Sequence, residues 1–110
     1  MFLPIPIVTT LPTAGTLPAS IGALAVTNST ALEITGKVTS GAGTVTLCRW
    51  FPELGVWRPW AEYAAMTADA AANSACFSGR YKVAQTGPVY FILIAAGVVL
   101  TSAHGEGVVY

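Results

Sequence analysis

Few residues in this chain are of types that carry out chemistry, and they lie far apart in the sequence. His104 is the only histidine, and the nearest carboxylate in the sequence is that of Glu106. One imidazole and one carboxylate two residues apart do not match the spacing of a catalytic triad or of a metal site. The sequence therefore predicts a protein that is not an enzyme, with no catalytic residues, no metal ligands and no cofactor.

The two cysteines, Cys48 and Cys76, are compatible with one disulfide or with two buried thiols. They have no second pair with which to build a zinc site. The first residues lack the basic group that opens a secretory signal, so nothing points to an oxidising compartment. Free buried thiols are therefore favoured over a disulfide.

An aromatic group in the middle of the chain is the main candidate binding feature, formed by Trp50, Phe51, Trp57, Trp60 and Tyr63. Aromatic faces on a sheet can stack on sugar rings, so a carbohydrate-binding module is one alternative. Large aromatics on a hairpin more often fill the core or a subunit interface. We therefore predict that Trp50, Trp57 and Trp60 are core or interface residues.

The elements that would position these side chains are strands. From residue 31 onward apolar and polar residues alternate with period two, and Gly-containing turns are expected at residues 40–43, 52–55, 85–88 and 104–107. This pattern predicts an all-β fold, an antiparallel β-sandwich of seven to eight short strands over residues 31–110.

Two details of this sheet are open to test. Residues 61–75 are rich in alanine and are expected to form a long loop with at most one or two helical turns. In the hairpin around residues 52–55, a three-residue loop pairing Phe51 with Trp57 is favoured. The four-residue alternative places Arg49 opposite Arg58, a destabilising like-charge pair.

Residues 1–30 are expected to form an extended Pro-rich arm, because proline donates no ladder hydrogen bond and holds its predecessor extended. A free linker would be polar, whereas this arm is apolar. It is expected to lie along a groove or to add a strand to a sheet edge, of its own domain or of a neighbour. The arm residues predicted to make an interface are Phe2, Leu3, Ile5, Ile7, Val8, Leu11 and Leu17.

Charge is scarce: the 110 residues include five Lys and Arg and five Asp and Glu, and no charged side chain precedes Glu33. Such a chain has no basic surface for nucleic acid. Its surface is expected to be covered by protein subunits or by lipid. The apolar run from residue 89 is nearly long enough for a membrane span. Gly97 and many β-branched residues favour strands there, and a small single-span membrane protein stays an alternative.

A hairpin of residues 44–57, the segment 79–83, the strand 89–96 and a closing Gly-flanked hairpin resemble small β-sandwich virion proteins of tailed bacteriophages. These are accessory head proteins that decorate capsids or anchor head fibres. The resemblance covers residues 32–110 and carries over no functional residue. It implies a capsid decoration or cement protein, located in the virion after assembly in the host cytoplasm. A head-to-tail connector or tail component is the alternative within this class.

The partners that this resemblance implies are the major capsid protein or other virion subunits, and copies of the chain itself, often as a trimer. Many weak contacts on a repeating lattice gain strength through multivalency. If the arm makes the contacts with neighbouring subunits, deleting residues 1–18 is expected to leave a folded domain that no longer incorporates into particles.

Overall fold

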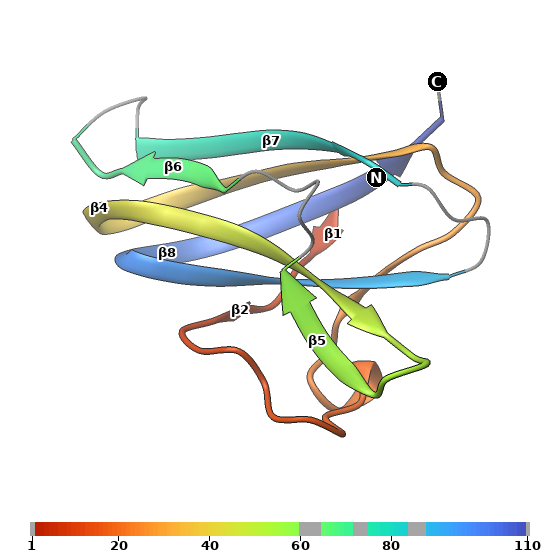
Figure 1. The fold of residues 1–110 in the computed structure, drawn as a ribbon. Helices are drawn as coiled ribbons and strands as arrows, with labels where there is room; N and C mark the ends of the chain where they lie inside the picture. The colour runs from red at the N-terminus through yellow and green to blue at the C-terminus, as the bar shows by residue number, and fades with distance from the viewer. Residues whose placement is uncertain (1, 60–64, 72–74, 84–87, 110) are drawn as a thin grey trace.

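A computed structural model describes residues 2–59, 65–71, 75–83 and 88–109 of the chain (Figure 1). The predicted all-β class is confirmed. Among these described residues, one short 3-10 helix, η1, covers Pro18–Ser20, and the other regular elements are strands. The strands are β1 (Leu3–Pro4), β2 (Ile7–Val8), β3 (Leu24–Val26), β4 (Ala31–Phe51), β5 (Val56–Pro59), β6 (Met66–Asp69), β7 (Cys76–Lys82) and β8 (Val89–Val108).

Two long strands organise the fold. β4 has 21 residues and β8 has 20, and they pair antiparallel from Ala31 opposite Val108 to Arg49 opposite Phe91. Figure 1 shows both strands turning back at the same end of the molecule. Of the eight described strands only five, β4 to β8, lie within residues 31–110, where seven to eight short strands were predicted, because β4 and β8 are far longer than the short strands expected.

Glycines make the bend possible without breaking the pairing. Gly41 and Gly97 have φ angles of +82° and +75°, a region that favours glycine, and the β4–β8 register shifts between Gly41 and Thr44. The turn predicted at residues 40–43 is therefore wrong, because this segment bends inside a continuous strand. The turn predicted at residues 104–107 is also wrong, since these residues belong to β8.

The remaining strands line the two edges of the β4–β8 ribbon. β7 pairs with the first half of β4, while β6 and β5 pair with its second half. On the other edge, β1, β2 and β3 all pair with β8, and the β2–β8 pair is parallel while every other described pair is antiparallel. The result is one eight-stranded sheet bent over on itself.

The main core lies between the two halves of this sheet. Alternate residues of each strand point inward, so that Leu32 and Ile34 from the first half of β4 share a cluster with Val45 and Leu47 from its second half. The same cluster includes residues from β3, β6, β7 and β8, such as Phe91 on β8. The bend therefore brings the two halves of each long strand into one hydrophobic core.

The N-terminal residues 3–8, here called the strap, cross from one half of β8 to the other. β1 pairs with β8 at His104 and Gly105, and the Ile5 amide donates to the Ala103 carbonyl at 3.0 Å. The Leu93 amide then donates to the Pro6 carbonyl at 2.9 Å, and β2 runs beside Leu93. Ile5 is only 3% exposed and belongs to the main core. The arm thus lies along its own domain.

Two further expectations of the sequence fail. The β4–β5 hairpin has the four-residue loop, with Arg49 opposite Arg58 and Trp50 opposite Trp57. The Arg49 guanidinium carbon lies 5.1 Å from the Phe51 ring centroid, a cation–π contact that stabilises the arginine. The alanine-rich segment expected to be a loop contains strand β6, and its residues 61–64 and 72–74 lie outside the described part of the chain.

Candidate interaction surfaces

Trp50 and Trp57 are the centre of a second hydrophobic cluster, on the outer face of the second half of the sheet. Their ring centroids are 5.4 Å apart with planes tilted by 52°. Both are buried, with Trp57 only 1% exposed. Trp57 therefore offers no open ring face on which a sugar could stack, and Trp50 is only 9% exposed. Trp60, the third aromatic predicted for this site, lies outside the described residues.

The arm covers this second cluster. Val8, Ile21 and Ala23 pack against it from the N-terminal segment. The Trp57 indole nitrogen Nε1 donates a hydrogen bond to the Thr16 carbonyl at 2.9 Å, which satisfies the one polar atom of a buried tryptophan. The tryptophans thus anchor the arm to its own domain.

One end of the molecule displays apolar side chains, and we call it the apolar end. It consists of Leu17, Leu54 and a surface hollow beside Leu17 that is described below. Leu17 precedes η1 and is 60% exposed, and Leu54 in the β4–β5 loop is 63% exposed. The Gly15 amide donates to the Gly55 carbonyl at 2.8 Å, which holds the arm against this loop. In Figure 1, η1 and the tip of the β4–β5 hairpin lie together at this end.

The hollow of the apolar end has a volume of about 280 Å³ and is mostly lined by apolar groups. Its lining comes from the arm and, on the sheet, from Trp50 and Tyr90. The residues around it are Leu17, Pro18, Ala19, Gly22, Ala23, Trp50 and Tyr90.

The outer face of the first half of the sheet is polar instead. Cross-strand rows run from β8 through β4 to β7, with Glu106, Glu33 and Arg80 in one row and His104, Thr35 and Ser78 in the next. Arg80 donates to the Glu33 carboxylate in an ion pair on this exposed face. A surface ion pair of this kind contributes little to stability.

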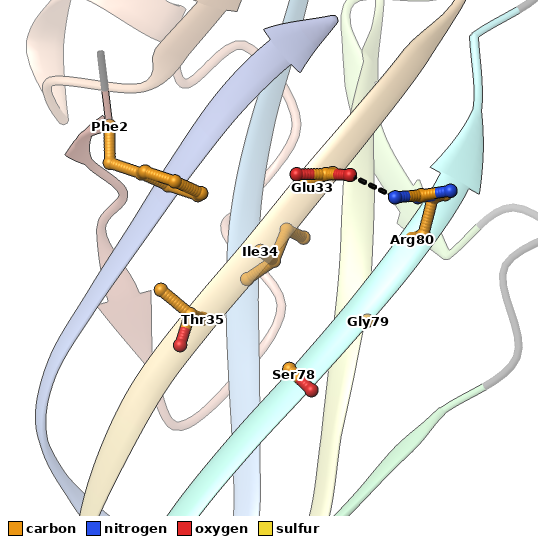
Figure 2. A pocket seen from close by; sticks show the side chains of 7 residues that line it. All are labelled: Phe2, Glu33, Ile34, Thr35, Ser78, Gly79 and Arg80. Atoms are coloured by element: carbon orange, nitrogen blue, oxygen red, sulfur yellow. Dashed lines mark hydrogen bonds and ion pairs between the residues drawn. The ribbon is translucent and has the colours of Figure 1, made fainter.

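A second hollow, of about 340 Å³, lies on this polar face (Figure 2). Figure 2 shows the Phe2 ring reaching across β8 toward Glu33 and Thr35 on β4, with Ser78 and Arg80 on the neighbouring β7. The hollow therefore combines one aromatic ring with hydroxyl groups and an ion pair.

The structure separates the predicted interface residues into three groups. Ile5 and Ile7 pack into the main core, and Val8 packs against the second cluster. Leu17, Trp50 and Trp57 come together at and beneath the apolar end. Exposed apolar side chains elsewhere on the arm are those of Phe2, Leu3 and Leu11.

Sequence reasoning missed Leu54 and Tyr90 as members of a surface. The signal for Leu54 was available, because a leucine in a hairpin loop stands where polar or turn-forming residues are usual. Tyr90 had no such signal, since it alternates with buried residues in an apolar strand.

His104 and Glu106 lie on β8 with partly exposed side chains on the polar face. Within residues 2–59, 65–71, 75–83 and 88–109, no three His, Cys, Asp or Glu side chains come close enough together to hold a metal ion. No helix in the same part of the chain is both long and apolar enough to cross a membrane.

The two cysteines have different environments. Cys48 is buried in the second cluster, whereas Cys76 is exposed at the start of β7, so the prediction of two buried thiols is wrong for Cys76. Burial raises the pKa of the Cys48 thiol from 9.0 to about 11, and burial also raises the pKa of the Tyr81 hydroxyl. The folded state thus holds both protons at pH values where the unfolded chain loses them.

These cysteines give a testable prediction. At pH 8 a thiol of pKa about 11 is only about 0.1% thiolate, so a disulfide reagent is expected to react with Cys76 at once and with Cys48 only on unfolding. A Cys76→Ser variant should lose the fast phase. The contribution of the Cys48 thiol to the free energy of unfolding should be constant below about pH 9 and fall as the pH rises from 9 toward 11. Two thiols reacting at equal rates in the native protein would contradict the burial of Cys48.

Comparisons with protein-family models, with curated proteins and with solved structures find no match to this chain.

Proposed function

We propose that this protein is a non-enzymatic structural component of a bacteriophage particle, a capsid decoration or cement protein that contacts neighbouring subunits through its apolar end. The observation that carries the proposal is the exposure of Leu17 and Leu54 on backbone that is hydrogen-bonded in place. Exposed apolar side chains that are gathered at one place are typical of protein interaction sites.

The rigidity of this surface supports the proposal. Leu17 follows Thr16, whose carbonyl accepts the Trp57 indole proton, and Leu54 sits in a loop joined to Gly15. Both leucines are therefore presented in a fixed geometry, so that little conformational entropy is lost when a partner covers them. A preorganised patch suits a protein that must bind the same site many times on a lattice.

Charge also supports a protein partner at this surface. No charged side chain occurs in the first 32 residues, and the hollow of the apolar end has no charged residue in its lining. The cores of protein interfaces are depleted of charge in the same way.

The test uses phage whose genome encodes this chain. Gradient-purified particles should contain the protein at a fixed ratio to the major capsid protein, measured by quantitative mass spectrometry. A Leu17→Ser, Leu54→Ser double variant should be lost from particles at least about tenfold, because each leucine contributes about 1.5–3 kcal/mol when fully buried.

The matched control is Val99→Ser, which changes an exposed apolar residue near the β8 bend. This variant should incorporate normally, and circular dichroism should show that both variants fold. Particles that lack the wild-type protein would refute the proposed role. Full incorporation of the double variant would refute the use of the apolar end.

A further inference from the structure

Side chains of unequal length shape the hollow on the polar face. Glu33 and Arg80 are long and lie opposite each other in one cross-strand row, whereas Thr35 and Ser78 are short and lie opposite each other in the next row on the same face. The short pair therefore leaves a step beside the long pair, and both short residues are exposed there. Phe2, which precedes β1, completes the lining (Figure 2).

The polar groups of this hollow offer donors and acceptors side by side. Arg80 donates to Glu33, so that a guanidinium, which has only donors, lies next to a carboxylate, which has only acceptors. The Thr35 and Ser78 hydroxyls each donate and accept. Neighbouring hydroxyl groups on a ligand suit this arrangement, because one can donate to the carboxylate while the next accepts from the guanidinium.

Phe2 adds an apolar surface that neither hydrophobic cluster uses. Its side chain is 42% exposed and lies outside both clusters. The face of an aromatic ring carries partial negative charge and attracts the hydrogen atoms of C–H groups. A pyranose ring presents C–H groups on one face and hydroxyl groups around its rim. An aromatic ring beside hydrogen-bonding groups therefore matches the two kinds of surface that a sugar offers.

The charges that line the hollow favour an uncharged ligand. Glu33 and Arg80 have opposite signs, so that an anion would meet the carboxylate and a cation would meet the guanidinium. Glu106 lies next to Glu33 in the same row, but it is not part of the lining. A neutral ligand can bond to both charged groups without separating them.

We propose that the hollow on the polar face binds one neutral pyranose ring, with a C–H face of the sugar against Phe2 and its hydroxyl groups bonded to Glu33 and Arg80. The volume of about 340 Å³ lies at the lower end of the range for small-molecule sites, which suits a single sugar ring. This binding activity goes beyond the proposed particle role, because it uses a face of the sheet other than the apolar end.

The test is a two-dimensional amide NMR titration of the full chain with glucose, galactose, mannose and N-acetylglucosamine. At least one of these sugars should shift the amide signals of Thr35, Ser78 and Arg80. A ligand of about twelve non-hydrogen atoms in an open hollow should bind with a Kd of about 1–10 mM. The amide signals of Leu17 and Leu54, at the apolar end, should not move.

Variants of the lining assign the binding to this hollow. Phe2→Ala should weaken it at least about tenfold, whereas Phe2→Trp keeps an aromatic face and should retain it. Arg80→Gln should weaken it about tenfold, and the fold should persist because the ion pair is on the surface. The matched control is Leu11→Ala, which removes an arm side chain that is 46% exposed and does not line the hollow. This variant should bind like the wild type.

Three outcomes would overturn the inference. The first is the absence of amide shifts with all of these sugars at about 200 mM, well above the expected Kd. The second is unchanged binding by Phe2→Ala. The third is an equal response of the same amides to inorganic phosphate or to tetramethylammonium, because the hollow would then select charge. These measurements need no phage particles, so their failure is distinct from a failure of the particle role.

Discussion

Replacing Gly43 with alanine should reduce the free energy of unfolding by about 3 kcal/mol or more, or prevent folding altogether. A Cβ atom on Gly43 would lie 1.9 Å from the Ala96 carbonyl oxygen and 3.0 Å from its carbon. Both atoms belong to the backbone of β8 at the bend, so no side-chain rotation can relieve the clash. Urea denaturation followed by circular dichroism measures the effect.

The matched control for this variant is Gly55→Ala. Gly55 has a φ of +66° and no atom within 4 Å of the position of an added Cβ. Its substitution should therefore cost only the left-handed backbone penalty of about 1–2 kcal/mol. If both variants had the same stability, the close approach of the two bent strands at Gly43 would be refuted.

Deleting residues 1–18 should abolish stable folding. The deletion removes the buried Ile5 side chain, the Pro6 carbonyl that accepts from Leu93, and the Thr16 carbonyl that accepts from Trp57. Loss of a buried isoleucine alone costs about 2–5 kcal/mol, and domains have only about 5–15 kcal/mol in total. An amide proton NMR spectrum should lose the dispersion of a folded sheet.

This expectation replaces the one drawn from the sequence, in which the shortened chain stays folded and only loses its partners. A chain lacking only residues 1–2 is the control, because Phe2 is 42% exposed and lies outside both hydrophobic clusters. That chain should unfold at the same urea concentration as the wild type. If the chain without residues 1–18 did so as well, the structural role of the strap would be refuted.

Period-two alternation was sufficient to predict the all-β class, because it reports the two faces of a strand directly. The bends could not be predicted in the same way. A glycine in an alternating segment looks identical whether it ends a strand in a turn or bends a strand that continues, and the difference lies in what its backbone meets. Gly43 and Gly97 meet the partner strand, so the pairing continues through the bend.

The hairpin register shows a second limit. The like-charge pair of Arg49 and Arg58 argued against the four-residue loop, yet that loop places Trp50 opposite Trp57 and both rings in one cluster. Burial of two indoles outweighs the repulsion of one pair of arginines, of which Arg58 is exposed to solvent.

The candidate surface was half predictable. The sequence identified Leu17, Trp50 and Trp57 as core or interface residues from their types, and the structure places them at or beneath the apolar end. It did not indicate that Leu54 and Tyr90 join them, because that proximity depends on the contact between the arm and the β4–β5 loop.

The dependence of so many elements on β8 has a consequence for biosynthesis. β1, β2, β3 and β4 all pair with β8, and the ribosome makes β8 after every other described strand. The β1–β8 pairing of Leu3 with Gly105 therefore cannot form until Gly105 has been synthesised. Nascent chains should stay open to proteases and chaperones until translation has passed β8, and folding should be slow because the β8 pairings join residues far apart in the sequence.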